Sequence, residues 1–130
     1  MTIAYLCILI AIFLPYVWTV IAKRSGAHYD NHAPREWLSQ QDNPRVHRAN
    51  AAQLNAFEAT PAFVAGVLMA QLAQVSSTCI ASLSVTFIVA RILHGVFYVA
   101  DKDKLRSLVW FIGFICILAL VIQAAIKVVG

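Results

Sequence analysis

Long apolar stretches, separated by short polar segments, constrain this chain more than any other feature of its sequence. The first is an uninterrupted apolar run over about residues 2–22, and Lys23 and Arg24 follow it directly. At about 1.5 Å per residue, a helix of about 20 residues crosses a hydrocarbon layer roughly 30 Å thick. We therefore expect an all-α integral membrane four-helix bundle, with transmembrane helices at about 2–22, 47–74, 79–100 and 106–126.

The composition leaves little material for a soluble part. Of the 130 residues, 61% are hydrophobic and only 12% are charged, which predicts a single transmembrane domain over residues 1–130. The first apolar run is of full spanning length and its positive charge follows it, whereas a signal peptide has its charge in front, so we expect a retained helix.

The formal charge of +4 is explained by membrane orientation, because most basic residues flank the predicted spans. We therefore expect no nucleic-acid partner. With four spans, eight of the ten Lys and Arg residues fall on the side that carries the 23–47 loop. The positive-inside rule places this side in the cytoplasm and both termini outside, in a membrane that we take to be the bacterial inner membrane.

The one long polar loop, over about residues 23–45, is predicted to carry a short surface helix at residues 35–41. Trp37 and Leu38 in that helix are expected to touch the membrane interface. Asn43-Pro44 is typical of a break before the next span. His28 and His32 lie four residues apart, but turn-forming neighbours and the lack of a further ligand argue against a metal site.

The second span carries three polar residues on one helical face: Arg48, Asn55 and Glu58. The same face continues as a stripe of alanines and a glycine, which allows close approach of membrane helices. An ionised Glu58 facing lipid would cost several kcal/mol, so it must be paired, protonated or directed at a wet cavity. A functional site is favoured over a purely structural clamp between helices.

The third span places Arg91, His94 and Tyr98 on one face, at spacings of three and four residues. An ion pair between Arg91 and Glu58, and direct contact of Arg91 with a ligand, both remain open. Arg106 and Ser107 begin the fourth span at the same membrane side. The convergence of these side chains predicts a pocket, open to the cytoplasm and bordered by lipid, that suits a small polyanion acting on an apolar partner.

Two motifs resemble those of a known family, the membrane-associated proteins in eicosanoid and glutathione metabolism (MAPEG). The resemblance covers about residues 45–113 and is closest to its bacterial members. The motif residues are Arg48-Ala49, Asn55, Glu58, Pro61 and Phe63 in the second span, followed by Arg91, His94, Tyr98, Arg106 and Ser107.

The resemblance implies a homotrimer that binds glutathione between neighbouring subunits. Asn55 and Glu58 would contact the tripeptide, and Arg48 would hold a carboxylate. The same site would be lined by Arg91, His94 and Tyr98.

The resemblance also places Arg106 near the glutathione sulfur. A guanidinium beside a thiol favours the thiolate, which is the nucleophilic form, and Ser107 could donate a hydrogen bond to the same atom. The implied activity is that of a glutathione-dependent transferase or peroxidase. Its small apolar electrophile would arrive through the lipid.

The sequence departs from the characterised eukaryotic enzymes of that family at residues 51–54, where Ala-Ala-Gln-Leu stands in place of a segment with a further arginine. One carboxylate contact is therefore missing. A non-catalytic relative that binds a lipid or a partner protein remains an alternative. A small four-helix multidrug transporter is disfavoured, because such proteins carry an essential glutamate in the first helix, which has no charge here.

Overall fold

The chain folds entirely into helices and connecting turns, which confirms the predicted all-α class. A computed structural model describes all residues, 1–130. The elements in chain order are α1 (Thr2–Ser25), α2 (Pro34–Ser39), α3 (Pro44–Leu72), α4 (Ser77–Val99) and α5 (Asp103–Val129).

The helix ends follow from local chemistry. Pro44 occupies the first turn of α3, where its missing N–H needs no partner, and the Asn43 side chain accepts a hydrogen bond from the Arg45 amide at 3.0 Å. The break predicted at Asn43-Pro44 is therefore correct. Helix α1 runs through Lys23 and Arg24, whose charges favour the last turn of a helix, so it is longer than the apolar run.

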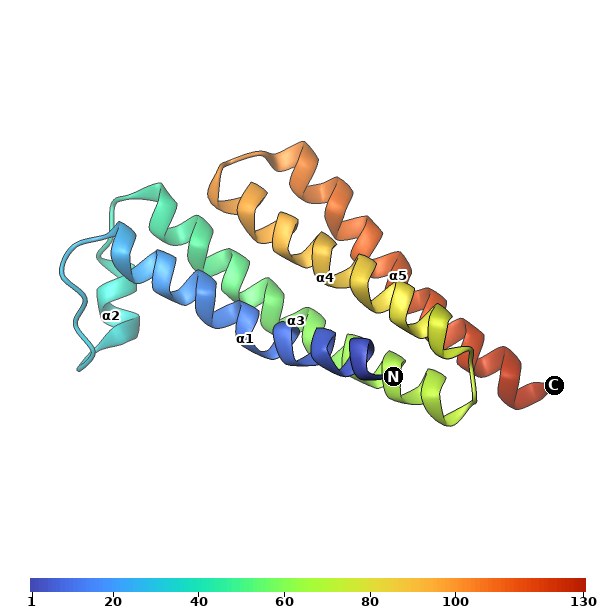
Figure 1. Ribbon diagram of the computed structural model, residues 1–130. Helices are drawn as coiled ribbons and strands as arrows, with labels where there is room; N and C mark the ends of the chain where they lie inside the picture. Colours follow the sequence, from blue (N-terminus) through green and yellow to red (C-terminus); the bar gives the residue numbers. More distant parts are fainter.

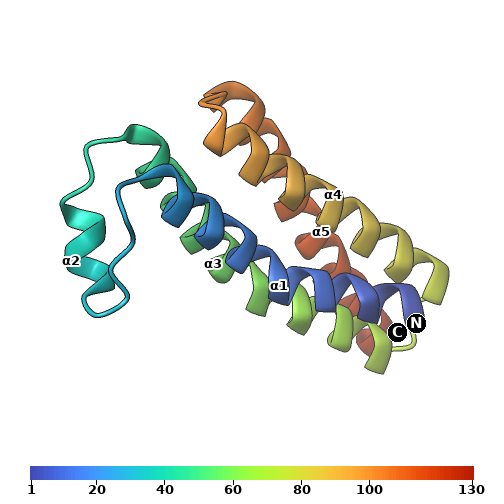
Figure 2. The same ribbon diagram turned by 60° about the vertical axis from the view of Figure 1, so that its left-hand side comes forward.

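The four long helices run alternately up and down. Figures 1 and 2 show both termini and the α3–α4 turn at one end of the molecule, with α2 and the α4–α5 turn at the other. Helices α3 and α4 each contact all three of the other long helices, whereas the contacts of α1 and α5 are mainly with these two. We call the end with α2 the basic end and the opposite end the terminal end.

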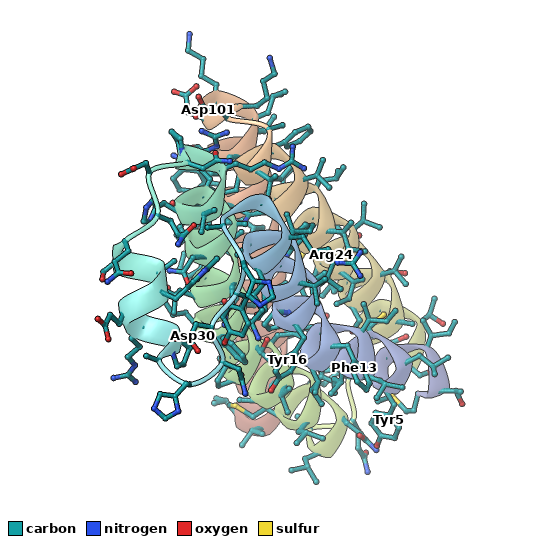
Figure 3. The ribbon with its side chains drawn as sticks, turned by 90° about the vertical axis from the view of Figure 1, so that its left-hand side faces the viewer. Tyr5, Phe13, Tyr16, Arg24, Asp30 and Asp101 are labelled. Atoms are coloured by element: carbon teal, nitrogen blue, oxygen red, sulfur yellow. The ribbon has the colours of Figure 1, made fainter.

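Three helices, α1, α4 and α5, are long and apolar enough to cross a membrane. Helix α3 has 29 residues but is not among them, because Arg45, Arg48, Asn55 and Glu58 lower the apolar character of its first half. Large apolar side chains are exposed along the three spanning helices, as expected for surfaces that meet lipid tails. Figure 3 labels three of those on α1, Tyr5, Phe13 and Tyr16.

The terminal half of the bundle holds the largest apolar core. Phe63 of α3 and Phe87 of α4 stack with their ring centroids 4.0 Å apart, and both are almost fully buried. Leu120 of α5 is fully buried over Gly66, where an added Cβ would lie 3.3 Å from the Leu120 Cβ. The small residues predicted to allow close helix approach on α3 therefore do so here.

The basic half is joined mainly by contacts of α1. Trp18 packs with Leu14, Ala52 and Ala56, and a Cβ added at Gly95 of α4 would overlap the Trp18 indole. Close contact between α1 and α4 therefore requires glycine at position 95. Proline 15 in α1 cannot donate to the Ala11 carbonyl, and the Thr60 hydroxyl of α3 lies 3.4 Å from that oxygen.

The loop helix forms at Pro34–Ser39, but one of its predicted contacts is wrong. Trp37 is only 7% exposed and turns inward, packing with Ala22, Val46 and Ala49. Its indole N–H donates to the His28 carbonyl at 3.0 Å. Burial of the ring beneath the loop satisfies the N–H within the protein, so this tryptophan fixes the loop instead of anchoring in the interface.

Candidate functional site

Two neighbouring cavities lie where α3, α4 and α5 meet, in the basic half of the bundle. Each has a volume of about 240 Å³, and Asn55 and Trp110 line both. The deeper cavity is also lined by Glu58 and Arg91, and the other by His94, Tyr98, Arg106 and Ser107. The structure therefore brings seven of the eight sequence-predicted site residues together around two adjoining spaces.

Arg91 is held across the bundle by Asn55. Its Nη2 donates to the Asn55 Oδ1 at 2.6 Å, which links α4 to α3, and the side chain is only 5% exposed. A guanidinium has five N–H groups, so this one bond leaves donors that line the deeper cavity. An anion or carbonyl oxygen entering that cavity would find them already oriented.

Glu58 lines the same cavity from α3, but its side chain is exposed on the surface of the chain. The hydrogen bond that Arg91 makes is to Asn55, so the structure favours an amide clamp over the Arg91–Glu58 ion pair left open by the sequence. The Glu58 carboxylate thus faces the mouth of the deeper cavity. It is available to a cationic group that arrives from outside the chain.

The second cavity is bounded by two aromatic contacts on α4. The His94 ring meets the Tyr98 ring edge-to-face, with centroids 5.5 Å apart, and the Arg106 guanidinium lies over Tyr98 at 4.4 Å from the ring centroid. Tyr98 therefore positions Arg106 by a cation–π contact. His94 is 2% exposed and its Nδ1 is buried without a hydrogen-bond partner, which marks a polar atom that the folded chain alone leaves unsatisfied.

Arg106 and Ser107 enter this cavity from the first turns of α5, which begins at Asp103. Arg106 is half-buried and Ser107 is exposed. A guanidinium and a hydroxyl on consecutive residues at a cavity mouth can both act on one anionic atom, the first by charge and the second by a hydrogen bond. No cluster of three or more His, Cys, Asp or Glu side chains that could hold a metal ion is present.

Arg48 is the one predicted site residue outside the two cavities. Its Nε donates to the Val99 carbonyl at 3.2 Å, close to the end of α4. This bond caps a carbonyl that the helix leaves free and ties the start of α3 to α4. The position of Arg48 thus has a structural explanation within the single chain.

The aromatic and aliphatic walls of the cavities were not predicted from the sequence. On α5 the walls are formed by Trp110, Phe114 and Ile117, which follow Arg106 at spacings of four, four and three residues, and by Phe111 next to Trp110. In a helix that is apolar all round, this spacing alone could not show which face meets the polar residues. Phe87 of α4 lies one turn before Arg91, so the spacing to Arg91 could have indicated that it lines the same cavity.

The fold and the site together define an α-helical integral membrane protein with an arginine-containing polar site inside its bundle. The family model of the MAPEG family matches residues 3–126, so the chain belongs to that family. This confirms the resemblance drawn from the two motifs. No curated protein and no solved structure matches the chain.

Proposed function

We propose that this protein is a membrane glutathione-dependent transferase or peroxidase, which activates a thiol for attack on a small apolar electrophile. The observation that carries the proposal is that Arg106, Ser107, Tyr98 and His94 surround one cavity, which adjoins the Arg91 cavity through Asn55. The cationic side chains Arg91 and Arg106 thereby lie at two adjoining cavities that share Asn55, as an extended anionic ligand requires.

The charges of glutathione match this lining. The tripeptide carries two carboxylates, one ammonium group and a thiol. The free donors of Arg91 suit a carboxylate, the exposed carboxylate of Glu58 suits the ammonium group, and the Asn55 amide suits the peptide backbone. His94 offers a further ring nitrogen to a polar group in the second cavity.

Arg106 supplies the chemistry in this proposal. Its positive charge stabilises the thiolate over the thiol, so the sulfur proton leaves to solvent and the sulfur becomes the nucleophile. The thiolate then forms a bond to the electrophilic atom while the bond from that atom to its leaving group, or the O–O bond of a peroxide, breaks, and the departing anion takes a proton from solvent. Ser107 orients the sulfur by donating a hydrogen bond. The apolar walls, including Trp110 and Phe111, accept the apolar substrate from the lipid side.

Assembly is part of the proposal, because Glu58 is exposed in the single chain. A carboxylate on a lipid-facing surface would cost several kcal/mol, and a neighbouring copy removes that exposure. We therefore propose a homotrimer with the site at its subunit contacts. In it α3 serves as the fourth transmembrane helix, with its polar face covered by protein and ligand.

The positive-inside rule orients this assembly. Arg24 and Arg45 lie at the basic end of the bundle by the bounds of their helices, together with Lys102 and Lys104 at the α4–α5 turn, whereas Lys127 lies near the end of α5, at the terminal end. We propose that the basic end faces the cytoplasm, with both termini outside, in a bacterial inner membrane. The whole chain then acts as one membrane domain.

Thiolate formation tests this function directly. Ultraviolet absorbance of purified protein mixed with glutathione should show a thiolate signal, which Arg106→Ala abolishes and Ser107→Ala reduces. Arg24→Ala is the matched control, because it removes a charge at the same end of the bundle but lines neither site cavity. A wild-type signal that survives Arg106→Ala contradicts the assigned role.

One observation favours the non-catalytic alternative. Residues 51–54 carry no arginine, and Arg48 is engaged by the Val99 carbonyl, so the lining has fewer free cations than its motif suggests. A protein that binds a lipid or a partner protein through the same cavities would give no thiolate signal. Absence of the signal in the wild-type protein, with no change in Arg106→Ala, supports this alternative.

A further inference from the structure

A third hollow, separate from the two site cavities, lies between the loop at the basic end and helices α1 and α3. Its volume is about 540 Å³, and it shares no lining residue with the other two. The charged residues in its lining are Lys23 and Arg35, and no acidic side chain contributes to it. The hollow is therefore electropositive.

The loop that encloses this hollow is built to keep its shape. The Gln41 side chain accepts a hydrogen bond from the Ala27 amide at 2.9 Å and donates one to the Trp37 carbonyl at 3.0 Å. Asn43 donates to the Ser25 carbonyl at 2.8 Å, and the Tyr29 and Trp37 rings meet edge-to-face with centroids 5.2 Å apart. These contacts fix the loop against the adjoining ends of α1 and α3, so the hollow between them is a feature of the fold.

The polar groups of the hollow suit a phosphate. The Lys23 ammonium lies 4.1 Å from the centroid of the Tyr29 ring, which holds it at the hollow by a cation–π contact and not by a carboxylate. Arg35, on α2, also lines the hollow. Asn50 and Gln53 of α3 add amide N–H donors to the same lining.

The membrane-facing side of the same hollow is apolar. Leu54 lines it and is 52% exposed. One turn further from the basic end on each helix, Tyr16 of α1 and Phe57 of α3 form an exposed edge-to-face pair with centroids 5.6 Å apart. The surface thus changes from cations through amides to exposed apolar side chains along one line, as a phospholipid changes from headgroup to acyl chain.

We propose that this hollow is a binding site for one anionic phospholipid, with the phosphate between Lys23 and Arg35 and an acyl chain over Leu54, Phe57 and Tyr16. A soluble phosphate compound shares the headgroup chemistry, but the apolar extension and the position at the level of the membrane surface favour a lipid. The site does not depend on the thiol chemistry proposed above.

Native mass spectrometry of the full-length detergent-solubilised protein tests the proposal. Phosphatidylglycerol, which is anionic, should remain bound in preference to phosphatidylcholine, which has no net charge. The double variant Lys23→Gln/Arg35→Gln should lose roughly tenfold or more of the retained phosphatidylglycerol, because each basic residue would donate a charge-assisted hydrogen bond to the bound phosphate. Inorganic phosphate alone should displace little of it.

The matched control is the double variant Arg24→Gln/Arg45→Gln. These arginines line a different hollow at the same end of the bundle, so the control removes the same charge from the same membrane level. It should change phosphatidylglycerol retention less than about twofold, because these two arginines make no direct charge-assisted bond to a phosphate in the hollow. Equal losses in both double variants would mean general surface attraction and would overturn the site.

Two further outcomes would also overturn the proposal. Equal retention of the two lipids by the wild-type protein would exclude headgroup recognition. Binding of inorganic phosphate that depends on Lys23 and Arg35, without preference between the lipids, would assign the hollow to a soluble phosphate. A Leu54→Gln variant separates these cases, because it should weaken lipid retention and leave phosphate binding unchanged.

Discussion

The two halves of the bundle are built from similar helices but are packed differently. In the terminal half, the Phe63–Phe87 stack and Leu120 fill the space between helices with buried apolar side chains. In the basic half, the same helices α3, α4 and α5 diverge around polar side chains and two cavities. The packed half supplies a rigid base, and the open half holds the groups that can bind.

This contrast depends on very few residues. Phe87 belongs to the stacked core and also lines the deeper cavity, and Arg91 follows it by one turn. A change from close packing to a polar cavity therefore occurs within one turn of α4. The four experiments below test whether the two halves respond as differently as their packing implies, in order of decreasing expected effect on the free energy of unfolding.

The largest effect is expected for truncation in the packed half. Leu120→Ala should lower the free energy of unfolding by about 3 kcal/mol, because the fully buried side chain leaves a cavity that the helices cannot close. Phe111→Ala, on the same helix but 56% exposed at the second cavity, should cost less than about 1 kcal/mol. Unfolding in mixed micelles measures both, and equal costs would show that Phe111 is covered by another protomer.

A smaller loss is expected where the basic half is closely packed. Gly95→Ala should cost about 2 kcal/mol, because the added methyl group would overlap the Trp18 indole. In a Trp18→Val background the same substitution should cost less than about 0.5 kcal/mol, since the overlapping ring is gone. A cost that is independent of residue 18 would contradict this contact.

The polar clamp should contribute less again. Asn55→Ala removes the acceptor of the Arg91 hydrogen bond and should cost about 1 to 2 kcal/mol, because the buried guanidinium loses a partner. Asn55→Asp keeps an acceptor at the same place and should retain most of the stability. Thermal unfolding of the two variants separates the loss of the bond from a general intolerance of substitution at residue 55.

The smallest effects are expected for two helical glycines, one in each half. An added Cβ at Gly113 would meet the Arg91 Cδ at 3.6 Å, an ordinary contact, so Gly113→Ala should gain up to about 1 kcal/mol in helix propensity. At Gly66 the added Cβ would lie 3.3 Å from the Leu120 Cβ, so the same gain should be offset by crowding. Equal responses in unfolding experiments would mean that the halves do not differ in free space.

Much of the fold could be predicted because membrane helices are specified by length and apolarity. The part of α1 over the apolar run at residues 2–22 and the start of α3 at Asn43-Pro44 follow from an apolar run and a local cap. The spacing of Arg91, His94 and Tyr98 also places them on one face without further information. Their clustering with Arg106 could also be predicted, because consecutive antiparallel helices bring the end of α4 and the start of α5 to the same side of a membrane.

The rest depends on how the helices rotate against one another. Sequence spacing could not show that Arg91 would bond to Asn55 and not to Glu58, because both acceptors lie on the same face of α3. It also could not show that Arg48 would reach the Val99 carbonyl. The inward orientation of Trp37 depends on loop contacts between distant residues, for which the sequence carries no periodic signal. The catalytic and glutathione-binding roles of the site residues stay predictions.

Helix α3 touches all three of the other long helices and is the least apolar of the four. In the proposed membrane arrangement, helix α3 alone in hydrocarbon would leave Arg48 and Glu58 unpaired. The helices that contact α3 must therefore be present when it enters the membrane. Insertion of the chain and packing of its helices are therefore coupled through α3. In a nascent chain that ends at Leu72, α3 would have α1 as its only long partner helix. Its contacts with α4 and α5 would form only after those helices enter the bilayer.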